Sequence, residues 1–215
     1  MALIFPRNTD KYVRIAGIIV GLFAVTGAAA YTYFSHPRVL DTGYAPIQPV
    51  PYSHKVHAGN LGMDCYYCHH TVYKSWYAAI PATETCMNCH TRIKPQSERL
   101  LKVRESYASG QSIPWVQIHK LPDYVYFNHQ AHISAGVSCV SCHGRVDQME
   151  VVKQVQPLSM AWCLDCHRNP APNLRPVELV TRLGWQPDRD PVEIGREIIA
   201  AKHINPPQNC SGCHR

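Results

Sequence analysis

The stretch from Tyr52 to His69, YSHKVHAGNLGMDCYYCH, decides the fold of this chain. It ends in a Cys-x-x-Cys-His sequence, in which two cysteines are followed directly by a histidine. Two further histidines, His54 and His57, stand three residues apart upstream of the cysteines. Paired thiols with an adjacent imidazole, preceded by spare imidazoles, indicate a site for a metal-containing group, and the same pattern recurs along the chain.

All ten cysteines of the 215-residue chain lie in five such motifs. The motifs are Cys65/Cys68/His69, Cys86/Cys89/His90, Cys139/Cys142/His143, Cys163/Cys166/His167 and Cys210/Cys213/His214. Roughly 0.03 motifs would be expected by chance from this composition. Zinc sites usually pair two Cys-x-x-Cys units or end in spaced histidines, and disulfides need no histidine. Because Cys-x-x-Cys-His is the attachment sequence of c-type haem, the sequence predicts five covalently attached c-type haems whose irons bind the motif histidines.

The N-terminal region predicts a membrane anchor. Residues 15–34 carry no charge and are long enough to cross a bilayer as a helix. Arg7, Lys11 and Arg14 precede this run, which predicts that the N-terminus stays in the cytoplasm and the haem motifs lie outside. A cleaved signal peptide is the competing interpretation, since residues 28–30 are three alanines, but the apolar run is long for one.

We therefore expect four regions along the chain. They are a cytoplasmic N-terminus at 1–14, a transmembrane helix at 15–34, a Pro-containing tether at 35–51 and an extracytoplasmic pentahaem domain at 52–215. Covalent haem is assembled outside the cytoplasm, which places the domain on the periplasmic face of a bacterial inner membrane. The formal net charge of +6 does not indicate a nucleic-acid partner, because haem propionates would offset the surplus of Arg and Lys.

The length of the chain predicts that the haems form the core. About 175 residues follow the anchor, and this is too little polypeptide to surround five haems with an ordinary apolar core. No long strand pattern is present, so we expect a mainly α and loop fold with little regular secondary structure. Helices are predicted at Gln96–Ser109, closed by Gly110, and at Asp190–Lys202, where Asp190 precedes Pro191 in an N-terminal capping pattern.

An internal repeat divides the expected domain into modules. The sequence aromatic, small polar, His, two residues, His occurs at Tyr52–His57 and again at Phe127–His132. Each copy leads into two haem motifs, which gives dihaem modules at 52–90 and 127–167 and a fifth haem unit at 203–215. Repeats of this kind indicate duplicated units that stack on one another.

Five irons need five second ligands, and four come from the repeat. His54, His57, His129 and His132 stand in the aromatic-x-His-x-x-His pattern. This pattern resembles the class III multihaem cytochromes c, where the first histidine commonly binds the nearest downstream haem and the second binds a neighbouring one. For the fifth iron we favour Met160, with His119 and His203 as alternatives, although a methionine in this position is more often core filling.

Three longer segments carry a family resemblance: Ile118–His132 (IHKLPDYVYFNHQAH), Pro157–Arg168 (PLSMAWCLDCHR) and Asn205–Arg215 (NPPQNCSGCHR). Together with the anchor and the five motifs, they resemble the pentahaem cytochrome subunit of alternative complex III, a quinol-oxidising complex. The resemblance implies partner subunits of three kinds: an iron–sulfur subunit related to molybdopterin enzymes, polytopic quinol-binding membrane subunits and a monohaem cytochrome c. It also implies one His/Met haem among bis-His haems.

The leading hypothesis is therefore a non-catalytic electron-transfer subunit of a membrane quinol:electron-acceptor oxidoreductase. The chain has no Cys-x-x-Cys-Lys motif and no separate acid–base constellation, so we assign no catalytic residue. The alternatives are a free-standing, membrane-anchored quinol dehydrogenase and an enzyme with an open, five-coordinate haem.

Overall fold

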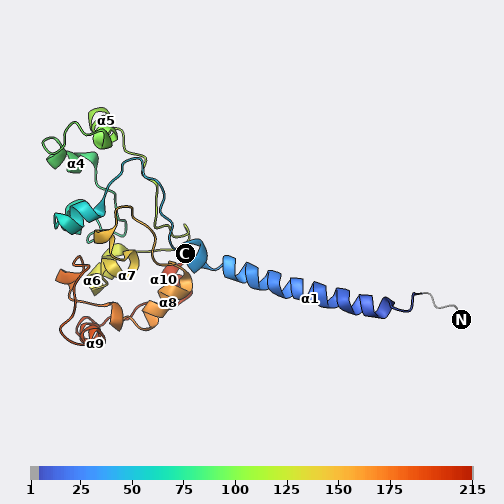
Figure 1. Cartoon of the computed structure of the whole chain (residues 1–215). Helices are drawn as coiled ribbons and strands as arrows, with labels where there is room; N and C mark the ends of the chain where they lie inside the picture. The colour runs from blue at the N-terminus through green and yellow to red at the C-terminus, as the bar shows by residue number, and fades with distance from the viewer. Residues whose placement is uncertain (1–4, 215) are drawn as a thin grey trace. The chain divides into compact units, whose positions relative to one another are not determined.

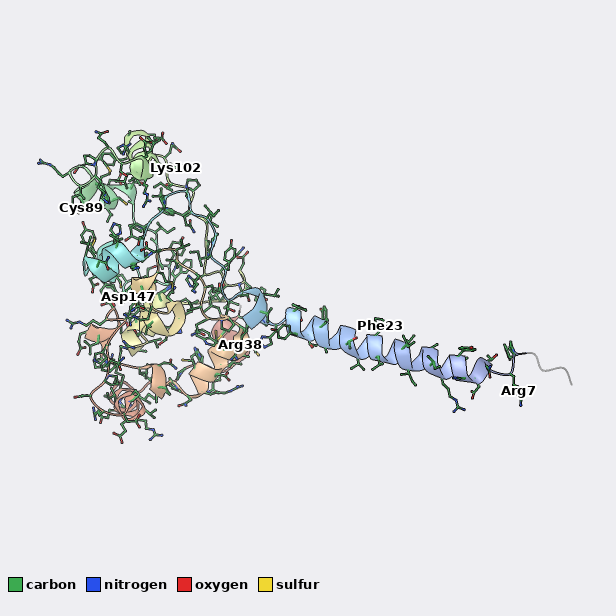
Figure 2. The ribbon with its side chains drawn as sticks, viewed as in Figure 1. Arg7, Phe23, Arg38, Cys89, Lys102 and Asp147 are labelled. Carbon is green, nitrogen blue, oxygen red and sulfur yellow. The ribbon has the colours of Figure 1, made fainter. Side chains whose placement is uncertain are left out.

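The computed structural model describes residues 5–214 and divides into two compact units, Met1–Asp41 and Thr42–Arg215 (Figure 1). The first unit contains α1 (Thr9–Phe34) and the single turn α2 (Pro37–Leu40). No residue of α1 is buried, and Figure 2 shows Phe23 standing out from the helix. By length and composition, α1 could cross a membrane.

The helix α1 begins six residues before the uncharged run, at Thr9. Its extra turn is polar and holds an i,i+4 ion pair between Asp10 and Arg14 at 2.7 Å. A helix can continue beyond an apolar segment wherever its side chains favour it, so the helix bounds do not mark the ends of a membrane span. The anchor at 15–34 stays a prediction.

The second unit consists of short helices joined by long loops. Its helices are α3 (Cys65–Cys68), α4 (Thr83–His90), α5 (Leu101–Ser109), α6 (His129–Ala135), α7 (Cys139–His143), α8 (Met160–Arg168), α9 (Pro191–Lys202) and α10 (Cys210–Cys213). Shorter turns are η1 (Lys55–Asn60), η2 (Glu98–Leu100), η3 (Val146–Gln148), η4 (Ala171–Asn173) and η5 (Val177–Leu179). Within residues 5–214 there is no strand, and the β-type pairs are the isolated bridges Val125–His214 and Val137–Leu174. The prediction of a mainly α and loop fold is confirmed.

Both helices predicted outside the haem motifs are present. The segment at 96–109 forms η2 followed by α5, and Gly110 closes it in the left-handed conformation (φ 70°). In α9 the Asp190 carboxylate accepts a hydrogen bond from the N–H of Val192, with Pro191 in the first turn. These elements follow from local signals alone, which is why the sequence predicts them.

The polypeptide itself builds a sparse core. The buried hydrophobic side chains among the described residues are Val50, Val72, Val103, Ile133, Ala171, Leu174, Val180 and Ile194. The accessible area of the chain is 15210 Å², although a folded protein of 24.2 kDa exposes about 10000 Å². The isolated helix α1 accounts for part of this excess, and the rest reflects the loose interior of the haem-motif unit. This agrees with the expectation that bound haems complete the core.

One buried cluster joins the two predicted modules. Val72 follows the first haem motif, Ile133 lies in α6, and Val180 comes from the loop between the fourth and fifth motifs. Val180 is fully buried at 0% exposure. Because these residues lie far apart in the sequence, their contact fixes how the segments around the first and third motifs pack.

The packing of α9 against η4 generates a stability prediction. A Cβ atom built on Gly195 would overlap the carbonyl oxygen of Ala171, so α9 can approach this closely only with glycine at that position. We expect Gly195→Ala to lower the unfolding free energy by about 1–3 kcal/mol, through the backbone shift that overpacking forces.

The matched control is Gly184→Ala, where the nearest atom to the new Cβ would be the end of the Arg145 side chain at 3.4 Å. Denaturant unfolding of the haem-loaded protein measures both variants. Equal unfolding midpoints for the two variants would contradict the assigned role of Gly195.

Candidate haem sites

Each haem motif folds as a short helix that holds both of its cysteines. The five helices are α3, α4, α7, α8 and α10. In a helix, residues i and i+3 lie on one face, so each Cys-x-x-Cys pair presents both thiols to one side. Side chains cap three of these helices: Asp64, Ser138 and Ser159 accept hydrogen bonds from backbone N–H groups two or three residues later. The sequence thus positions three of the five thiol pairs through local capping.

Burial is the main cause of a raised pKa for five of the ten thiols. It raises the pKa of Cys142 to about 12, and it is also the main cause of the raised pKa values of Cys68, Cys86, Cys163 and Cys166. A buried thiolate would be costly, whereas a thioether carries no ionisable proton and tolerates the same burial. The surroundings of these sulfurs therefore suit thioether attachment.

Cys89 and Cys210 differ from the other motif cysteines, because both are exposed whereas the other eight are half-buried. Figure 2 marks Cys89 on α4, a helix that packs against α5 and has no buried residue. The polypeptide therefore leaves the Cys89 side of the second motif uncovered. Haem attachment at all ten cysteines stays a prediction.

Four motif histidines are oriented by backbone carbonyls. The distances from Nδ1 to the carbonyl oxygen are 3.3 Å for His69–Ala79, 2.9 Å for His90–Ile93, 2.7 Å for His167–Pro207 and 3.3 Å for His214–Tyr124. An Nδ1–H that donates to a carbonyl leaves the lone pair of Nε2 for a metal. The tautomer that binds iron is thus the one that the fold favours.

Three of the four histidines of the repeat show the same arrangement, whereas Nδ1 of His54 is buried without a hydrogen-bond partner. Nδ1 lies 2.8 Å from the Ser53 carbonyl oxygen in His57 and 2.7 Å from the Asn128 carbonyl oxygen in His132. In His129 the partner is the carbonyl of Trp76, at 3.1 Å, which belongs to the first module. Each of these side chains therefore also has Nε2 free for a metal.

Three histidines of the repeat, His54, His57 and His132, face a motif histidine at the spacing of axial ligands. The ring centroids are 6.5 Å apart for His54–His69, 6.2 Å for His57–His90 and 6.1 Å for His132–His167. A metal lies about 2.0–2.1 Å from an imidazole nitrogen and the ring centre about 1.2 Å beyond, so two rings that share one metal have centres about 6.4 Å apart. The residues present therefore fit a six-coordinate haem iron at three of the five motifs.

The aromatic residue of the repeat orients both histidines that follow it. Tyr52 makes an edge contact with His54 (interplanar angle 86°) and stacks on His57 (21°). Phe127 repeats both contacts with His129 (89°) and His132 (26°). One ring thus turns the two imidazoles to different directions, which allows two histidines three residues apart to serve different haems.

The third motif has two candidate partners. His119 lies 4.3 Å from His143 between ring centroids, at 73°, and its Nε2 is buried without a hydrogen-bond partner. His129 also lies near enough to lower the pKa of His143, which burial, His119 and other nearby imidazoles bring to about 3. The separation of 4.3 Å is too short for an iron between the rings as they stand. The sequence named both residues, and the choice between them stays open.

The fifth motif has no facing imidazole among the ring contacts of the described residues; its His214 lies 5.6 Å from the ring of Tyr124. Met160 is the first residue of α8 and its side chain is 65% exposed. His203 is exposed at the C-terminus of α9 in the left-handed conformation (φ 52°). Neither residue is tested as an iron ligand by these contacts, and Met160 stays a prediction.

Sequence reasoning missed the carbonyl groups of Trp76, Ala79, Ile93, Tyr124 and Pro207 that hold the imidazoles. Every residue type carries a carbonyl, so no residue pattern marks the ones that accept these bonds. The aromatic residues of the repeat, by contrast, were visible as part of the pattern.

Comparisons with known proteins indicate similarity to multihaem cytochromes c. Residues 34–112 match the model of the class III cytochrome C family, and residues 125–215 match the model of cytochrome c7 and related cytochrome c. A curated protein of Nitratidesulfovibrio vulgaris, the multiheme cytochrome c subunit of a menaquinone reductase, is 36% identical over 131 residues. The match covers 60% of this chain and 58% of that protein, less than two thirds of its length.

The facing pair at the fourth motif generates a test of these sites. We expect His132→Ala to leave the His167 iron without its second ligand, so that one haem becomes high-spin while the covalent haem content is unchanged. His70→Ala is the matched control, because His70 is exposed and lies outside the ring pairs. Electron paramagnetic resonance and pyridine haemochrome assays measure spin state and haem content, and a fully low-spin His132→Ala protein would reject His132 as a ligand.

Proposed function

We propose that this chain, a multihaem cytochrome c related to the class III and c7 families, is the electron-transfer subunit of a membrane-bound, quinone-linked oxidoreductase. The observation that carries the proposal is the set of facing imidazoles, at 6.1–6.5 Å. An iron with a nitrogen ligand on each face has no open position for a substrate. Such haems exchange single electrons, and the chain then contributes a conducting path rather than an active site.

The cofactor content is five c-type haems, one on each Cys-x-x-Cys-His motif. His54, His57 and His132 are proposed as second ligands to the irons of His69, His90 and His167, in line with the ring pairs. These residues would bind the iron from one face. Nδ1 hydrogen bonds hold His57 and His132 in orientation, whereas Nδ1 of His54 is buried without a hydrogen-bond partner. When bound, haem supplies one-electron redox chemistry.

His119 or His129 would complete the iron of His143, and Met160 is proposed for the iron of His214. Met160 stands three residues before Cys163, on the same side of α8. Cys163 in turn lies close enough to Cys213 for Cys213 to raise the pKa of Cys163. A thioether ligand would raise the potential of that haem above those of the bis-His haems.

The proposed setting is the inner membrane of a bacterium, with α1 as a single-pass anchor and the haem motifs on the periplasmic side. The positive residues before the apolar run support this orientation. The proposed partners are an iron–sulfur subunit related to molybdopterin enzymes, polytopic quinol-binding subunits and a monohaem cytochrome c. The resemblance to alternative complex III supports oxidation of quinol, whereas the relative from N. vulgaris is described as part of a menaquinone reductase.

The alternative function is a free-standing quinol dehydrogenase, which the membrane-length helix alone would also permit. The decisive experiment is purification of the native chain in mild detergent, followed by stopped-flow reduction of its haems with menaquinol. We expect other subunits to co-purify with the chain. Once these subunits are removed, menaquinol should no longer reduce the haems. An isolated chain that takes electrons directly from menaquinol would overturn the proposal.

The same preparation distinguishes the two directions of electron flow. If menaquinol reduces the haems and they pass electrons to a monohaem cytochrome c, the chain belongs to a quinol-oxidising complex of the alternative complex III kind. Haems that are reduced only from the periplasmic side, and are then reoxidised by menaquinone, indicate a quinone reductase.

The fifth ligand generates a separate prediction. We expect Met160→His to remove the highest-potential step from a redox titration while all five haems remain attached, because imidazole lowers the potential relative to a thioether. Met149→His is the matched control, since Met149 lies after η3, outside the motifs. A titration that Met160→His leaves unchanged would reject Met160 as a ligand.

A further inference from the structure

We infer that the five haem motifs lie in space in the order second, first, third, fourth, fifth, and that the turn at Val180–Thr181 holds the first and third together. This order differs from the order along the chain at one point: the first motif stands between the second and the third. The inference adds the spatial arrangement to the proposed function and rests on it only for the presence of the haems.

The second motif lies beside the first. His57 faces His90 of the second motif, whereas His54, three residues earlier, faces His69 of the first. In addition, Asn88 Nδ2 donates to the hydroxyl of Tyr67 over 3.1 Å. Asn88 lies between the cysteines of the second motif and Tyr67 between those of the first, so the two attachment helices touch directly.

The first motif lies beside the third across the loop that contains Val180. The carbonyl oxygen of Val180 accepts hydrogen bonds from the hydroxyl of Ser138 at 2.8 Å and from the N–H of Cys139 at 3.3 Å. The next residue, Thr181, donates its hydroxyl to the Asp64 carboxylate at 2.9 Å. Ser138 and Asp64 directly precede the first cysteine of the third and the first motif, respectively. One turn therefore forms hydrogen bonds with both attachment helices at equivalent positions.

The two cysteines at this junction lie close together. The thiol of Cys65 lies 3.9 Å from the carbonyl oxygen of Thr181, and Cys65 and Cys139 are near enough for each to shift the pKa of the other. These are the first cysteines of their motifs, so the corresponding attachment edges of two haems are brought together. The segment before the third motif adds a further tie, because the N–H of His129 bonds to the carbonyl of Trp76.

The third, fourth and fifth motifs follow in turn. His132, from the segment before the third motif, faces His167 of the fourth. Cys142 of the third motif lies within electrostatic range of Cys163 and Cys166 of the fourth. His167 also bonds to the carbonyl of Pro207, in the loop that enters the fifth motif.

This arrangement places the two modules back to back. In each module the second histidine of the repeat reaches the outer motif, and the inner motifs meet at Val180. Val180 is fully buried between Val72 and Ile133, so it is a positioning residue: its side chain is apolar and binds no metal, but its size sets the separation of the inner motifs.

The direct test is electron cryo-microscopy of the native, haem-loaded complex. We expect the irons bound by His90, His69, His143, His167 and His214 to follow one another in that order. Another iron standing between those of His69 and His143 would overturn the inference. The outcome does not depend on electron flow, so the order can hold even if the menaquinol experiment fails.

The role of Val180 is tested with Val180→Phe, which adds bulk at the junction and forces the inner motifs apart. We expect a loss of amplitude in the Soret circular dichroism couplet, which arises from coupling between neighbouring haems, with five haems still attached. Val151→Phe is the matched control, because Val151 is 56% exposed. Spectra that are identical for the two variants would reject the positioning role.

If Val180→Phe is not produced with five haems, Thr181→Val replaces it. This change keeps the shape of the side chain and removes only the hydrogen bond to Asp64. We expect a smaller loss of the same couplet, and an unchanged spectrum again rejects the role of the turn.

Discussion

A neutral imidazole binds a metal only through a nitrogen that carries no proton. This requirement accounts for contacts throughout the second unit, Thr42–Arg215. The fold meets it with backbone carbonyls that accept the Nδ1 proton, at distances of 2.7–3.3 Å. Several of these carbonyls come from remote segments, such as Pro207 for His167 and Tyr124 for His214. Hydrogen bonds to the imidazoles thus help to fix the positions of loops that have no regular structure.

The need to surround five haems also explains why the chain has so small an apolar core of its own. A polypeptide of this size that must surround five haems cannot also bury many of its own side chains. Long-range order then depends on a few contacts, and Val180 is the clearest, since it joins segments around the first and third motifs. The loop that contains Val180 therefore provides the long-range packing that a pair of helices provides in an ordinary domain.

How much the sequence could reveal follows from the range of each interaction. The haem motifs, the histidine repeat, α5 and α9 depend on residues within one or two turns, and the sequence predicts them. The partner of each imidazole, the place of Val180 and the exposure of Cys89 depend on how remote segments pack. The helix α1 extends from Thr9 beyond the predicted span at 15–34, because hydropathy marks the apolar run and not the helix.

The duplication also explains why the haem order departs from the chain order. In both copies the second histidine of the repeat faces the motif that follows the inner one, and in the first copy His54 also faces the inner motif, as the pairs at 6.1–6.5 Å indicate. A module built in this way has an inner end and an outer end. Two copies joined at their inner ends make a continuous row, and the second motif then stands at one extremity. Joining them head to tail would instead have kept the order of the chain, at the cost of the Asp64 and Ser138 contacts that Val180 and Thr181 make.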